Sequence, residues 1–71
     1  GDVYKRQEYQ KSKAYYYLAC VESDLEQKEE AEIHFKKAIK LAKETEEYDH
    51  LAKICKRCSL YYQKYGTSTA I

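Results

Sequence analysis

Residues 14–42 read AYYYLACVESDLEQKEEAEIHFKKAIKLA, and this stretch decides the fold. In its first half, apolar residues recur at the spacing of one helix face: Ala14, Leu18, Val21 and Leu25. In its second half the same spacing returns: Ala31, Phe35, Ala38 and Ala42. The short polar connection between them contains neither Gly nor Pro. A connection this short forces two helices to lie antiparallel, so the pattern predicts a helical hairpin.

Working outward, the sequence predicts an all-α chain with helices over residues 8–25, 28–44 and 47–65. Thr45 is the expected N-cap of the third helix, and Gly66 is expected to end it. The third helix also carries an apolar stripe: Leu51, Ile54, Cys55, Cys58, Tyr61, Tyr62 and Tyr65. We expect residues 67–71 to form a frayed tail.

Composition limits the classes of function. The 71 residues include 13 basic and 12 acidic side chains, so the formal net charge of +1 provides no strong field toward nucleic acid or membrane. No apolar run approaches a membrane span, and no signal-peptide pattern is present. Three cysteines cannot all pair within the chain, so reduced thiols in a cytoplasmic setting are the simplest interpretation.

The hairpin resembles a tetratricopeptide repeat. The resemblance rests on an aromatic-Leu-small pattern and then an Ala-Phe-Ala pattern: Tyr15, Leu18, Ala19, Ala31, Phe35 and Ala38. Tyr15 replaces the family's Trp, Ala19 its Gly and Glu22 its Tyr, and the closing Pro is missing. The resemblance implies an α-solenoid that binds proteins or peptides and has no catalysis of its own.

The third predicted helix copies the first. A shift of 40 residues lays Leu18 on Cys58 and Val21 on Tyr61. The segment KAIKLAKETEEYDHLAKI followed by YYQKYG also resembles the lengthened repeats of bacterial peptide-sensing regulators and related signalling proteins. Because a single repeat cannot bury its apolar face alone, we expect residues 8–66 to be about one and a half repeats of a longer array, packed against neighbouring repeats. The resemblance implies a cytoplasmic signalling or scaffold parent.

The resemblance also assigns roles to individual residues. The expected repeat core is Tyr15, Leu18, Ala19, Ala31, Phe35, Ala38, Cys55 and Cys58. The expected peptide groove is Lys13, Tyr16, Cys20, Ser23, Lys53, Lys56, Leu60 and Gln63. Its three lysines favour an extended acidic peptide, although a solvated lysine face is an equally simple interpretation.

Residues 1–7, GDVYKRQ, resemble a translated sequencing-adapter remnant found in reading frames assembled from environmental DNA. We therefore expect this heptamer to be a non-native leader. The alternative is a genuine helix start with Asp2 as the N-cap.

No residue set predicts catalysis, a cofactor or a metal. Cys55 and Cys58 lie mid-helix without further ligand spacing, so packing is favoured over a metal or redox site. His34 and His50 are expected to be surface residues without an acid-base partner. A nucleic-acid-binding bundle using Lys53, Lys56 and Arg57 stays open as an alternative, although the neutral charge argues against it.

Overall fold

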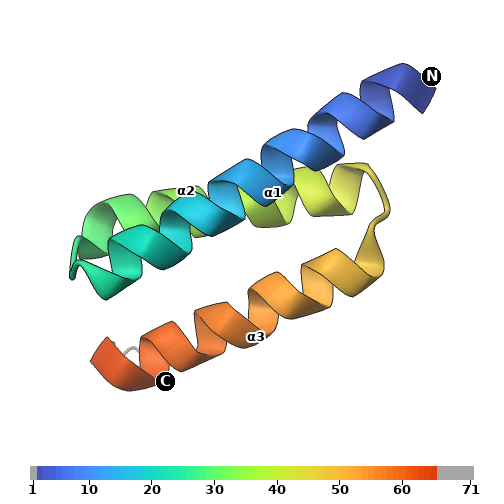
Figure 1. Ribbon diagram of the computed structural model, residues 1–71. Helices are drawn as coiled ribbons and strands as arrows, with labels where there is room; N and C mark the ends of the chain where they lie inside the picture. The colour runs from blue at the N-terminus through green and yellow to red at the C-terminus, as the bar shows by residue number, and fades with distance from the viewer. Residues whose placement is uncertain (1, 66–71) are drawn as a thin grey trace.

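The computed structural model describes residues 2–65, and it contains three helices in this range and no strand. They are α1 (Asp2–Asp24), α2 (Lys28–Glu44) and α3 (Tyr48–Tyr65). Consecutive helices run antiparallel in an elongated body of 40 × 24 × 14 Å (Figure 1). α1 and α2 pack along most of their lengths, whereas α3 packs mainly on α2 and touches α1 at few points. The predicted all-α hairpin with a third helix is confirmed.

The helix boundaries differ from the prediction mainly at the start of α1. This helix begins at Asp2, so residues 2–7 continue it rather than preceding it. Residues 5–13 are rich in strong helix formers, and Lys11 pairs with Glu8 at 3.1 Å on one turn. The predicted ending at Gly66 and the predicted tail lie outside the described residues.

Both connections have the same backbone geometry. Glu26 and Glu46 adopt left-handed conformations, with φ of 62° and 59°. After α1, the Gln27 amide donates to the Glu22 carbonyl at 2.8 Å, and the Glu26 amide donates to the Ser23 carbonyl at 3.1 Å. The same two bonds recur after α2. This is the Schellman motif, which closes a helix and reverses the chain in three residues.

Thr45 has a different role from the predicted one. It follows the last residue of α2, and its hydroxyl lies 2.9 Å from the Leu41 carbonyl and 3.2 Å from the Ala42 carbonyl. These carbonyls belong to the end of α2, where helix acceptors lack intrahelical partners. Thr45 therefore caps the C-terminus of α2, and the prediction that it begins the third helix is wrong.

The core lies along α2. Its buried residues are Ala19, Ala31, Phe35, Ala38, Ala42, Ile54 and Tyr61. Phe35, which is 1% exposed, stands between the rings of Tyr16 on α1 and Tyr61 on α3, with centroids at 6.5 and 5.8 Å. Small residues on α2 let both neighbours approach closely, and the single large ring fills the space where all three helices meet.

The expected apolar stripe of α1 does not face the core. Ala14 is exposed, and so are Leu18 (41%), Val21 (38%) and Leu25 (62%). The buried side chains of α1 are instead mostly polar: Ser12, Ala19, Glu22 and Ser23. The assignment of Leu18 to the core is therefore wrong for this chain.

Polar residues occupy the buried face of α1 because they have partners on α2. The Ser12 hydroxyl donates to the Ala38 carbonyl at 2.7 Å, and Glu22 lies 2.6 Å from His34 Nδ1. An ionised carboxylate only accepts, so Nδ1 carries the proton in this pair. His34 is thus half-buried and paired, not a lone surface residue as predicted.

Cys55 also lies outside the core. It is exposed, whereas Ile54 is fully buried and Cys58 is half-buried. Adjacent helical residues point about 100° apart, so the turn of α3 that directs Ile54 into α2 directs Cys55 away from it. The prediction of a core role fits the placement of Cys58 but is wrong for Cys55.

Candidate functional site

The predicted groove residues divide into three groups by burial. Tyr16 and Cys20 of α1 are half-buried, and Ser23 is buried. The others are exposed, one on α1 and four on α3: Lys13, Lys53, Lys56, Leu60 and Gln63. Because Ser23 is buried, its side chain cannot contact a bound peptide. The accessible part of the surface therefore consists of lysines and neutral side chains around a half-buried tyrosine.

His50 joins α1 and α3 at this surface. It is buried, and its Nε2 lies 3.1 Å from the Ser12 hydroxyl. Because the single hydroxyl proton of Ser12 goes to the Ala38 carbonyl, Nε2 must be the donor to Ser12. The rings of Tyr9 and Tyr16 meet the imidazole edge-on, with centroids at 5.4 and 5.8 Å. The expectation of an exposed His50 is therefore wrong.

Lys13 and Lys53, which belong to two different helices, both act electrostatically on this imidazole. Burial lowers the pKa of His50, and the positive charges of Lys13 and Lys53 lower it further, while Glu47 opposes them. Lys13 Nζ also lies 4.8 Å above the Tyr9 ring. Two lysines that are distant in sequence therefore add their positive potential at one place.

These lysines form no ion pair with a carboxylate among the described residues. The ion pairs of residues 2–65 join Lys11 to Glu8, His34 to Glu22, and Arg57 to Asp24 at 3.2 Å. Lys13, Lys53 and Lys56 take part in none of them. An anion that approaches this surface would therefore meet lysines that form no ion pair among residues 2–65, with Glu47 as an acidic group nearby. Arg57, the third cation of the nucleic-acid alternative, is already paired.

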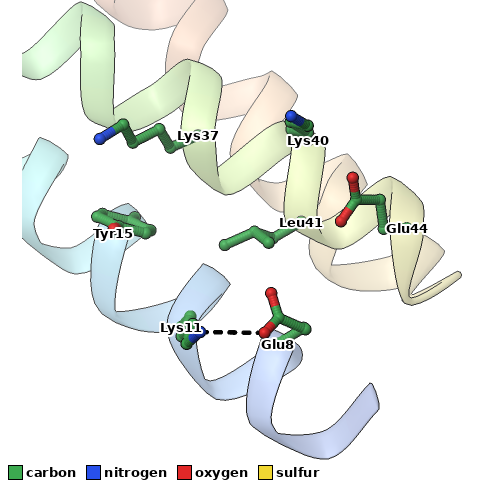
Figure 2. Close-up of a pocket in the computed structure, with 7 residues that line it drawn as sticks. All are labelled: Glu8, Lys11, Tyr15, Lys37, Lys40, Leu41 and Glu44. Carbon is green, nitrogen blue, oxygen red and sulfur yellow. Dashed lines mark hydrogen bonds and ion pairs between the residues drawn. The ribbon is translucent and has the colours of Figure 1, made fainter. Parts of the chain in front are cut away.

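A hollow lies between α1 and α2, away from the lysine surface (Figure 2). It encloses about 350 Å³ and is lined by Glu8, Lys11, Tyr15, Lys37, Lys40, Leu41 and Glu44. Tyr15, expected in the core, is half-buried here and stacks on His34 at 5.6 Å. Lys37 Nζ lies 5.5 Å from the same ring. Three lysines and two glutamates nearly balance, so the hollow shows no clear preference for charge.

The outer face of α1 forms a third surface. Leu18, Val21 and Leu25 lie on it with Tyr17, which is 73% exposed. Under the 40-residue shift, Leu18 corresponds to Cys58 and Val21 to Tyr61, which both pack against the core. The face of α3 that packs on α2 therefore corresponds, under this shift, to the face of α1 that is exposed.

The cysteine alternative has little support in the arrangement of side chains. All three cysteines are free thiols, and burial raises the pKa of Cys58, which lowers its thiolate fraction. Within residues 2–65, no group of three or more His, Cys, Asp or Glu side chains is placed to hold a metal ion.

Two tyrosines fix α3 on α2. The Tyr61 hydroxyl donates to the Lys28 carbonyl at 3.0 Å, and the Tyr62 hydroxyl donates to Glu32 at 3.1 Å. Burial and this bond to Glu32 raise the pKa of Tyr62 to about 12. Tyr61 and Tyr62 thus serve packing, and Tyr16 is the half-buried tyrosine that borders the lysine surface.

Comparison of the chain with protein-family models, with curated proteins and with solved structures gave no match in any of the three. The likeness to tetratricopeptide repeats therefore rests on the residue pattern. None of the three helices, over the part of the chain that is described, is both long and apolar enough to cross a bilayer.

Proposed function

We propose that the chain is a protein- or peptide-interaction module of the tetratricopeptide type, without catalysis of its own. Its ligand would be an extended acidic segment lying along the surface between α1 and α3. The observation that carries the proposal is that Lys13 of α1 and Lys53 of α3 both act electrostatically on buried His50, and neither forms an ion pair among residues 2–65. The parent would be a regulatory or scaffold protein of a reducing, cytoplasmic compartment, where three thiols stay free.

α1 and α3 would contribute different contacts to the bound peptide. Lys53 and Lys56 of α3 would attract acidic side chains, and the exposed body of Leu60 would contact the peptide backbone or an apolar residue. Tyr16 would contribute an amphipathic edge, as tyrosines do at interfaces. Much of the attraction would come from exposed charges, so added salt should weaken binding.

The test uses a fluorescent Glu-rich peptide and measures its anisotropy with the purified chain. The double reversal Lys53→Glu with Lys56→Glu should weaken binding by at least about tenfold, roughly 1.4 kcal/mol. The matched control is Lys36→Glu with Lys40→Glu, which makes the same change in net charge on exposed positions of α2. Control binding should stay near that of the wild type.

Equal losses in both double variants would mean that only bulk charge attracts the peptide, and the proposal would fail. Unchanged binding in the α3 variant would also overturn it. Binding of a short DNA duplex is measured in the same way. Tighter binding to DNA than to the peptide, with a steep salt dependence, would favour the nucleic-acid alternative instead.

A further inference from the structure

The outer face of α1 carries an apolar strip of three exposed side chains, Tyr17, Leu18 and Val21, and Leu25, just after the helix, extends it. Ala14 continues it by one turn. These residues recur every three or four positions, so they form one continuous band along the helix. A contiguous apolar band rimmed by polar residues is typical of an interaction surface.

The packing of α3 in this chain indicates which kind of partner the apolar strip of α1 suits. The corresponding positions of α3 include Cys58 and Tyr61, which pack on a neighbouring antiparallel helix, α2. The spacing on α1 therefore suits an antiparallel helix as its partner.

Charge distinguishes between possible partner helices. The first half of α1 carries four basic residues and two acidic ones, whereas from residue 14 to its end at Asp24 the charges are only acidic: Asp24 and the buried Glu22. Glu26 follows just after the helix. An antiparallel partner must therefore be acidic near the start of α1 and basic near its end. A helix with the charge order of α2, acidic first and basic later, would not gain this pairing of opposite charges.

We propose that the outer face of α1 pairs two copies of the chain, with the two α1 helices antiparallel about a two-fold axis near Leu18. The second copy meets the charge requirement, because each basic first half then lies beside an acidic second half. The two faces are identical, as a two-fold interface requires. This pairing shares only Lys13 with the acidic-peptide surface, so Leu18→Glu, which leaves Lys13 in place, separates the two proposals.

One ion pair fixes the register. Lys13 and Asp24 are eleven residues apart, about three turns, and therefore lie on the same side of α1. In the antiparallel dimer, Lys13 of each copy stands opposite Asp24 of the other. Asp24 is 72% exposed in its bond to Arg57, so it stays accessible to the second lysine. A single helix face buries less area than a standard interface, so the dimer forms only at high protein concentration.

The experiment is sedimentation equilibrium of the purified chain over a roughly hundredfold range of concentration. The wild type should shift from monomer to dimer across this range. Leu18→Glu should raise the dimer dissociation constant by at least about tenfold, because it places two carboxylates near the axis. Ile33→Glu, at an exposed position of α2, is the matched control and should dimerise as the wild type does.

The charge variants test the orientation. Lys13→Asp and Asp24→Lys should each weaken the dimer, and the two together should restore it. A wild type that stays monomeric at every concentration would overturn the proposal, as would a double variant no better than the single ones. Binding of a synthetic α2 peptide to the Leu18 face of a monomeric chain would instead assign that face to a neighbouring helix. Acidic-peptide binding, measured in Leu18→Glu, should stay unchanged.

Discussion

Ser12 on α1 and His50 on α3, which are 38 residues apart in sequence, meet with 3.1 Å between the Ser12 hydroxyl and Nε2 of the imidazole. The same hydroxyl donates to the Ala38 carbonyl of α2, so a single serine connects all three helices. Because α3 touches α1 at few points, this connection fixes much of the position of α3 relative to α1.

Ser12→Ala should lower the free energy of unfolding by about 1–2 kcal/mol, because the buried Nε2 proton of His50 would lose its acceptor. Urea denaturation followed by circular dichroism measures the change. Ser59→Ala, at an exposed position of α3, is the control and should change stability by less than about 0.5 kcal/mol. Equal effects of the two substitutions would mean that the Ser12 bonds contribute nothing specific.

Stability should fall as the pH drops below the ordinary His pKa of 6.5. Burial, Lys13 and Lys53 lower the pKa of folded His50, with Glu47 opposing. Ser12, Tyr9 and Tyr16 also face the ring, and the hydrogen bond with Ser12 acts in the same direction as Glu47. Between the two pKa values the unfolded chain binds a proton that the folded chain does not, so acid favours unfolding.

The measurement for this pH dependence is the free energy of unfolding of the wild type and His50→Gln from pH 8 to pH 5. The advantage of the wild type over the variant should shrink as the pH falls through this window. An advantage that stays constant, or grows in acid, would contradict the environment described for His50.

Glu26→Gly and Glu46→Gly should each stabilise the chain by about 1 kcal/mol, since glycine adopts the left-handed conformation without the steric cost that glutamate carries. The control is Glu30→Gly inside α2, which should destabilise by a similar amount. Thermal or urea unfolding detects both. A loss of stability at residue 26 or residue 46 would mean that these turns do not have positive φ.

Leu18→Ala and Ile54→Ala compare the two corresponding faces of α1 and α3. Ile54 is fully buried, so its truncation should cost about 2–5 kcal/mol in a monomer. Leu18 is 41% exposed, so its truncation should cost less than about 1 kcal/mol at protein concentrations too low for association. The reverse order in urea denaturation would place the core on the wrong side of α1.

Much of the fold could be predicted from the sequence, because helices are encoded by the spacing of residues close together in the chain. The 3.6-residue spacing of Ala31, Phe35, Ala38 and Ala42 correctly predicted the buried face of α2. The bounds of α2 agree with the prediction, and α3 begins within a residue of its predicted start. The two short connections correctly required antiparallel neighbours.

The buried face of α1 could not be predicted from the sequence in the same way. Periodicity chose Leu18 and Val21, but Ser12 and Glu22 are buried because Ala38 and His34 satisfy their hydrogen bonds. Those partners lie 26 and 12 residues away, so no local pattern reveals them. The same reason explains why His34 and His50 were misplaced, and why the joint electrostatic effect of Lys13 and Lys53 on one imidazole was not predicted.

The most direct measurement is the set of nuclear Overhauser contacts of the Phe35 ring in a labelled, dilute sample. The ring protons should show contacts to the rings of Tyr16 and Tyr61, since Phe35 lies between α1 and α3, and none to the methyl groups of Leu18. Strong contacts between Phe35 and Leu18, with none to Tyr61, would mean that α1 buries its aliphatic strip and that the surfaces assigned to both α1 and α3 are wrong.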